Sequence, residues 1–172
     1  AFPHATALAC IREELGAPAE ELFEETLKVW SKVDVGIACA AVADLRPINA
    51  SDKKMHKDEF PDAVELEKTP DTLKAMGDSK TPGQTLMGFA LETDNGIESA
   101  KGKLERKNLD FVVLNTLLDT GAGFNHDTNK VTVIKRVGVD TEMRSFELKS
   151  KTEVARDLVE LLFQDISWPF LE

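Results

Sequence analysis

The chain has 172 residues, and 42% of them are hydrophobic, which is enough for a sizeable buried core and indicates one globular domain. Its 21 basic and 31 acidic residues give a net charge of −10, which excludes an overall basic surface for nucleic acid but allows a local basic pocket. The sequence has no apolar run of the roughly 18 to 20 residues that a membrane span needs and no charged leader before an apolar core, so we expect a soluble cytoplasmic protein.

Apolar spacing along the chain predicts helices that alternate with short buried strands. Residues 20–30 place apolar side chains on one helical face, and residues 33–41 form a nearly continuous apolar run, typical of a strand buried on both faces. The alternation continues with predicted helices at 70–76, 95–107 and 151–163 and predicted strands at 85–90, 109–114 and 130–135. This order favours an α/β fold with a doubly wound, mostly parallel sheet.

Three stretches fall outside this alternation. Residues 46–68 contain two prolines and many charges, so we expect an excursion from the sheet that acts as a flap. Residues 118–130 have the Gly, Asn and Asp content of a loop, and long loops in compact domains are often functional. We assign residues 1–19 to no domain and expect the folded domain to comprise residues 20–172. Within it, Pro70 is the expected first residue of a helix and Thr69 its N-cap.

Several kinds of site are not supported by the sequence. Cys10 and Cys39 lie in apolar surroundings and form no CxxC motif, so a disulfide framework or a thiolate metal site is not expected. The three histidines lack metal-ligand spacing, and neither a P-loop nor a complete GxGxxG fingerprint is present. The nucleophile motif GxSxG is also absent.

Ligands of open α/β sheets bind beyond the carboxyl ends of the strands, and this rule selects the residues after each apolar run. Small residues at 39–43 would let a flat ring approach the backbone, and Asp44 could then accept a hydrogen bond from a ribose hydroxyl or hold a metal ion. A lone aspartate at a strand end more commonly caps the next turn, so both interpretations of Asp44 stay open.

Two basic clusters are also ambiguous when each is taken alone. The first, at 53–57 on the expected flap, is either a solvated patch or a set of lysines that closes over phosphate oxygens. The second comprises Lys103, Arg106 and Lys107, which share one helical face and either compensate the helix dipole or grip a triphosphate.

Several segments occur together in an order that resembles phosphopantothenoylcysteine synthetase, the coenzyme A pathway enzyme that in bacteria is often fused behind a flavin-dependent decarboxylase. The resemblance runs from about residue 20 to residue 162 and is far more specific than any one of its motifs. The segments are AAVADLRP at 40–47, Lys54, TPDTL at 69–73, GFALET at 88–93, KLERKNLD at 103–110, Asn115 and GAGFNHDTN at 121–129.

The resemblance implies a Rossmann-like fold, a homodimer and CTP-dependent joining of 4′-phosphopantothenate to L-cysteine through an acyl-cytidylate, with Mg²⁺ on the triphosphate. FMN would be needed only where a decarboxylase half exists elsewhere. Lys54 would be the catalytic residue, stabilising charge at the transferring centre. The nucleotide contacts that it implies are Ala40, Ala41, Asp44, Lys54, Pro70, Asp71, Thr72, Leu73, Phe89, Lys103 and Lys107.

Two motifs of the family do not occur in this sequence: a glycine-rich segment of the kind GPTxExID and an Asn-x-Ser-Ser-Gly segment. We therefore expect the chain to carry mainly the CTP-binding part and to form product poorly by itself. A catalytically silent, dimeric Rossmann-like scaffold or regulator is the alternative. An NAD(P)-dependent reductase would have the same kind of sheet, but this sequence lacks the glycine fingerprint of such enzymes.

Overall fold

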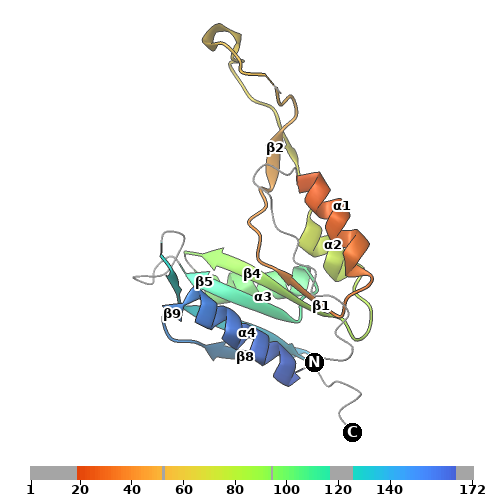
Figure 1. The fold of residues 1–172 in the computed structure, drawn as a ribbon, viewed down its shortest axis with the longest axis vertical. Coiled ribbons are helices and arrows are strands. Elements are labelled where there is room, and N and C mark those ends of the chain that lie inside the picture. The colour runs from red at the N-terminus through yellow and green to blue at the C-terminus, as the bar shows by residue number, and fades with distance from the viewer. Residues whose placement is uncertain (1–18, 52, 94, 117–125, 166–172) are drawn as a thin grey trace.

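Five strands form the main sheet of the molecule, in the order β1-β4-β5-β7-β8 (Figure 1). The first three run parallel, whereas the last two continue the sheet in antiparallel pairing. Their bounds are β1 Val35–Ala38, β4 Thr85–Glu92, β5 Phe111–Thr116, β7 Val131–Val137 and β8 Asp140–Ser145. The computed structural model describes residues 19–51, 53–93, 95–116 and 126–165.

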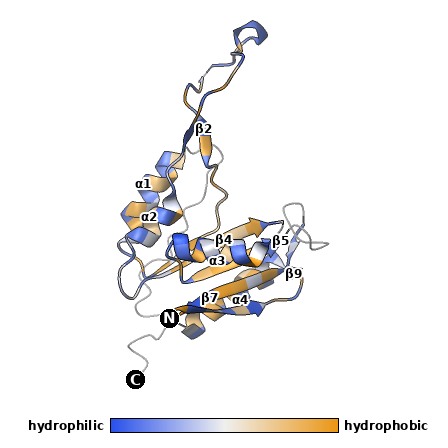
Figure 2. Ribbon diagram, turned by 180° about the vertical axis from the view of Figure 1, so that it is seen from behind, coloured by the Kyte–Doolittle hydropathy of each residue, from blue (hydrophilic) through white to orange (hydrophobic). Residues whose placement is uncertain are grey.

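Helices cover both faces of this sheet, because successive strand side chains point to opposite sides. On one face Leu86 and Val112 pack with Leu104, and on the other Met87 and Val113 pack with the last helix. Figure 2 shows the strands between these helices as largely hydrophobic. The first core includes α1 (Ala19–Trp30), α2 (Thr72–Asp78) and α3 (Gly96–Arg106), and the second includes α4 (Lys151–Asp165).

The α/β fold predicted from the apolar spacing is confirmed, and each predicted helix and strand overlaps an observed one. Two local expectations are wrong. The strand expected at 33–41 is limited to β1, which lies at the edge of the sheet and buries only Gly36. Thr69 is not the cap of α2, because Asp71 occupies that position and its carboxylate accepts a hydrogen bond from the amide of Lys74. Pro70 therefore precedes the helix rather than starting it.

The excursion expected at 46–68 is a hairpin that projects from the body of the molecule (Figure 1). Its base is formed by β2 (Leu45–Pro47) and β3 (Leu66–Lys68), which pair antiparallel, and a short 3-10 turn, η1 (Lys57–Glu59), lies near its tip. All of its charged side chains that the structure describes are exposed except Glu67, which is partly buried.

Most of the loop expected at 118–130 lies outside the described residues. Its last part forms β6 (Thr128–Asn129), which pairs with β9 (Lys149–Ser150) just before α4. Within the described ranges, no helix combines the length and apolar character needed to cross a bilayer.

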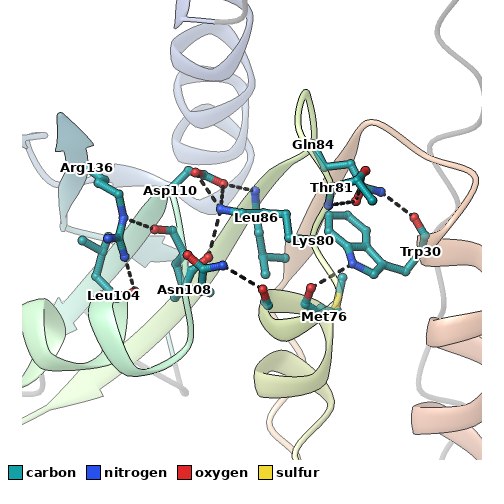
Figure 3. Close-up of polar contacts among 12 residues, drawn as sticks. Trp30, Met76, Lys80, Thr81, Gln84, Leu86, Leu104, Asn108, Asp110 and Arg136 are labelled. Carbon is teal, nitrogen blue, oxygen red and sulfur yellow. Dashed lines mark hydrogen bonds and ion pairs between the residues drawn. The ribbon is translucent and has the colours of Figure 1, made fainter. Parts of the chain in front are cut away.

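Polar side chains fasten the elements together at the amino ends of the parallel strands (Figure 3). Both carboxylate oxygens of Asp110 accept from Lys80 Nζ at 2.8 Å, and one also accepts from the amide of Leu86 at 2.7 Å. The indole N–H of Trp30 donates to the carbonyl of Met76 at 2.9 Å, so α1 is tied to α2. Arg136 donates to the carbonyls of Leu109 and Leu104, both at 2.9 Å. These contacts lie at the edge of the sheet opposite the carboxyl ends of its parallel strands.

Candidate functional site

A cavity of about 510 Å³ lies at the carboxyl ends of β1 and β4, beside α1, α2 and the last turn of α3. This is the edge at which open α/β sheets bind ligands. Its walls include most of the residues predicted for the nucleotide site: Ala40, Asp44, Pro70, Asp71, Thr72, Leu73, Phe89, Lys103 and Lys107. Parallel pairing of β1 with β4 explains how segments so far apart in the sequence meet there.

Two predicted residues are not part of this cavity wall. Ala41 is exposed beside it, between Ala40 and Val42, which do line it. Lys54 lies on the projecting hairpin and is exposed, so within one copy of the chain it is separated from the other predicted residues. The neighbouring basic residues Lys53, His56 and Lys57 are exposed as well.

The loop after β1 is held by Thr69. The hydroxyl of Thr69 donates to the carbonyl of Ala43 at 2.5 Å, and its amide donates to the carbonyl of Asp44 at 3.1 Å. The segment before α2 is thereby tied to the segment after β1. This arrangement presents the exposed side chain of Asp44 at the cavity wall.

The basic end of the cavity is formed by Lys103, in the last turn of α3, and by Lys107, the C-cap residue of that helix. Lys103 Nζ donates to the carbonyl of Phe89 at 2.6 Å, and Lys107 Nζ forms an ion pair with Asp71. Burial lowers the pKa of Lys103, and the positive charge of Lys107 lowers it further, although Glu92, Asp71 and Asp44 act in the opposite direction. Two partly buried ammonium groups on one helical face form an environment that favours an incoming anion.

Asp71 serves both α2 and the basic end of the cavity. Burial acts to raise the pKa of Asp71, but the hydrogen bonds from Lys107 and from the amide of Lys74 outweigh it and hold the pKa below its usual range. The neighbouring Thr72 hydroxyl oxygen is buried without a hydrogen-bond partner. An unsatisfied buried hydroxyl is a cost that a ligand or a water molecule could remove.

The other end of the cavity is apolar, and sequence reasoning missed it. Residues from α1 and from the start of β1 line it, among them Leu22, Thr26, Val29, Trp30, Val33 and Val35. The helical spacing of α1 indicated an apolar face, but spacing cannot distinguish a face that lines a cavity from one that packs in a core. Cys39, which was expected in apolar surroundings, is exposed and lines the cavity.

No group of three or more His, Cys, Asp or Glu side chains in the described ranges is arranged to hold a metal ion. Asp44, Asp71 and Glu92 all place negative charge near Lys103.

The sequence profile of the DNA/pantothenate metabolism flavoprotein C-terminal domain matches residues 14–166. The chain belongs to this family. A coenzyme A biosynthesis bifunctional protein CoaBC from Bacillus subtilis is 38% identical over 142 residues, which are 83% of this chain and 34% of that protein. A cysteine/cysteine sulfinic acid decarboxylase of unknown prokaryotic origin is 43% identical over 141 residues, which are 82% of this chain and 38% of that protein. The chain thus spans little more than a third of either relative.

Solved structures of this family share the fold. The crystal structure of the C-terminal domain of a CoaBC protein superimposes with a TM-score of 0.63 at 35% identity, covering 84% of this chain and 60% of that one. A Cab2 mutant in complex with phosphopantothenate-cysteine gives a TM-score of 0.59 at 15% identity, covering 85% of this chain and 51% of that one, and this likeness concerns the fold alone. The resemblance to phosphopantothenoylcysteine synthetase is confirmed at the level of the family and the fold.

Proposed function

We propose that this domain is the CTP-binding part of a phosphopantothenate–cysteine ligase of coenzyme A biosynthesis, acting in the cytoplasm. The observation that carries the proposal is one cavity, at the carboxyl edge of the sheet, that brings Asp44, Phe89, Lys103 and Lys107 together from three separate segments. The CoaBC relatives support the same assignment, since they are named as bifunctional proteins of coenzyme A biosynthesis.

The lining residues, together with the adjacent Ala41, suit the parts of a pyrimidine nucleotide. Backbone groups of Ala40 and Ala41 would read the cytosine ring, and the Asp44 carboxylate would accept from a ribose hydroxyl. Phe89 would wall the ring or the ribose. Lys103 and Lys107 would neutralise the phosphates, which they can approach from the last turn of α3.

The proposed reaction has two steps. The carboxylate of 4′-phosphopantothenate attacks the α-phosphorus of CTP, so that an acyl–oxygen–phosphorus bond forms and pyrophosphate leaves. The amine of L-cysteine then attacks the acyl carbon, an amide bond forms, a proton is lost from nitrogen, and CMP leaves. Mg²⁺ would enter as the counter-ion of the triphosphate.

Lys54 would stabilise the negative charge that develops in these steps. Because Lys54 lies on the hairpin, away from the cavity of its own copy, it would have to reach the cavity of a second copy of the chain. The hairpin exposes apolar side chains, with Phe60 at 64%, Val64 at 61% and Leu66 at 52% exposure. A two-stranded hairpin alone is marginally stable in water. We therefore propose a homodimer in which this hairpin packs against a partner and Lys54 reaches the partner's cavity.

The chain is expected to bind CTP more tightly than ATP, because backbone groups of Ala40 and Ala41, just after β1, would form hydrogen bonds with the edge of the cytosine ring. Calorimetric titration of the chain with each nucleotide in the presence of Mg²⁺ measures the two dissociation constants. Equal affinities for the two nucleotides would contradict the proposed pocket.

Product formation by this chain is expected to be slow, because the two family motifs noted above are absent from its sequence. Steady release of pyrophosphate in the presence of CTP, 4′-phosphopantothenate and L-cysteine should stay below about 1 per second, a typical lower value for enzymes. Turnover at or above that rate would show that the missing motifs are dispensable.

A second candidate is a catalytically silent dimeric module. It is favoured by the relative named as a cysteine/cysteine sulfinic acid decarboxylase, because a similar domain then occurs in a protein that is named for a different activity. A silent module would dimerise without any thermal shift on addition of CTP. The ligase proposal requires that shift, so one melting experiment distinguishes the two.

A further inference from the structure

The carboxylate of Asp71 is held at the basic end of the cavity by two partners. One oxygen accepts from the amide of Lys74 at 2.9 Å and so caps α2, while the other pairs with Lys107 Nζ. The side chain of Lys107 is 22% exposed and that of Asp71 is 49% exposed. Because the cap anchors Asp71, its negative charge stays beside Lys107 before any ligand arrives.

The charges near Lys103 show what an incoming anion would meet. Among the described residues, Lys107 places positive charge near Lys103, whereas Glu92, Asp71 and Asp44 place negative charge there. A phosphate that enters the cavity must therefore compete with Asp71 for Lys107. The depressed pKa of Asp71 means that the competing carboxylate is ionised near neutral pH.

We propose that Asp71 is a positioning residue that holds Lys107 in the cavity and, by competing with phosphate for it, limits the affinity of the site for polyphosphate anions. The inference rests on the proposed function, since it concerns how that site handles a triphosphate and the pyrophosphate that leaves. Inorganic pyrophosphate carries the charge without a base or ribose, so it would be the ligand most affected. Weak retention of pyrophosphate lets the first step of the proposed reaction proceed.

The experiment is calorimetric titration of the wild-type chain and of Asp71→Asn with inorganic pyrophosphate. Asparagine is as good an N-cap as aspartate, so α2 keeps its cap while the charge is lost. Pyrophosphate affinity should rise about fivefold, the factor that two unit charges about 4 Å apart produce in a water-like dielectric. The gain should shrink as salt is added, because salt screens exposed charges.

Asp78→Asn is the matched control. Asp78 lies at the other end of α2, pairs with Lys74 and does not line the cavity, so pyrophosphate affinity should stay unchanged. Combining Asp71→Asn with Lys107→Gln should remove most of the gain, because the lysine that is competed for is then absent. If Asp71→Asn does not fold, Asp71→Ser supplies an uncharged cap for the same titration.

Unchanged or weaker pyrophosphate binding by the folded Asp71 variant would overturn the inference. A gain of equal size in the Lys107→Gln background would overturn it too. If the wild-type chain binds CTP but the variant shows no gain, the inference alone fails. If the folded wild-type chain binds neither CTP nor pyrophosphate, the proposed function fails with it.

Discussion

Replacement of Gly77 with alanine is expected to destabilise the domain by about 3 kcal/mol. A Cβ atom at this buried position would lie 1.8 Å from the backbone carbonyl oxygen of Lys107, and a backbone atom cannot rotate away as a side chain can. The helices must separate or the turn after α3 must shift. Urea-induced unfolding measures the loss of free energy of unfolding.

Gly102→Ala is the matched control for this prediction, because Gly102 also lies inside a helix. A Cβ there would meet the end of the flexible Arg106 side chain, which can move aside. Alanine is favoured over glycine in a helix by about 1 kcal/mol, so this variant should keep or raise stability. A Gly77→Ala protein as stable as the wild type would show that α2 is not pressed against the end of α3.

The contact at Gly77 also bears on the site. Asn108 Nδ2 donates to the carbonyl of Gly77 at 2.8 Å, so the end of α2 is bonded to the second residue after α3. Asp71 is the N-cap of the same short helix, and Lys107 is the C-cap of α3. The close contact at Gly77 therefore places Lys107 against α2, the helix that Asp71 caps.

Lys54→Ala is expected to slow pyrophosphate release about a hundredfold while changing CTP affinity little. A lysine that stabilises charge developing in the transition state contributes to the rate of the chemical step rather than to binding of the ground state. The rate should be measured in a single turnover with the protein in excess over CTP, because this measurement does not require repeated catalytic turnover. CTP affinity is measured separately by calorimetry.

Asp44→Ala should show the opposite pattern. Loss of the proposed hydrogen bond to the ribose should weaken CTP binding about tenfold. Asp34→Ala is its control, because Asp34 is an exposed aspartate that precedes β1 and does not line the cavity. If neither Lys54→Ala nor Asp44→Ala changes the rate of pyrophosphate release or the affinity for CTP, both proposed roles are wrong. Lys54 is then part of a solvated basic patch, and Asp44 only stabilises a turn.

The kinds of element and their order along the chain could be predicted from the sequence, because hydrophobic periodicity is a local property. The apolar run at 109–114 and the helical spacing at 151–163 both correspond to observed elements, β5 and α4. The excursion at 46–68 was also visible in the sequence, through its prolines and charges. The antiparallel strand β8 was not predicted, because its alternate side chains are mostly polar and its pairing with β7 is a contact between segments.

The members of the candidate site were named from ordered motifs, but only the tertiary structure decided which of them meet. Parallel pairing of β1 with β4 brings Asp44 near Phe89 and Lys103, whereas Lys54 stays on a hairpin that leaves the body of the molecule. The ion pair between Asp71 and Lys107 joins residues 36 positions apart, and its partners depend on how α2 packs against α3. The spacing of apolar residues along a short segment specifies helices and strands. Distances between charged groups depend instead on how distant segments pack together, and no short stretch of sequence determines that packing.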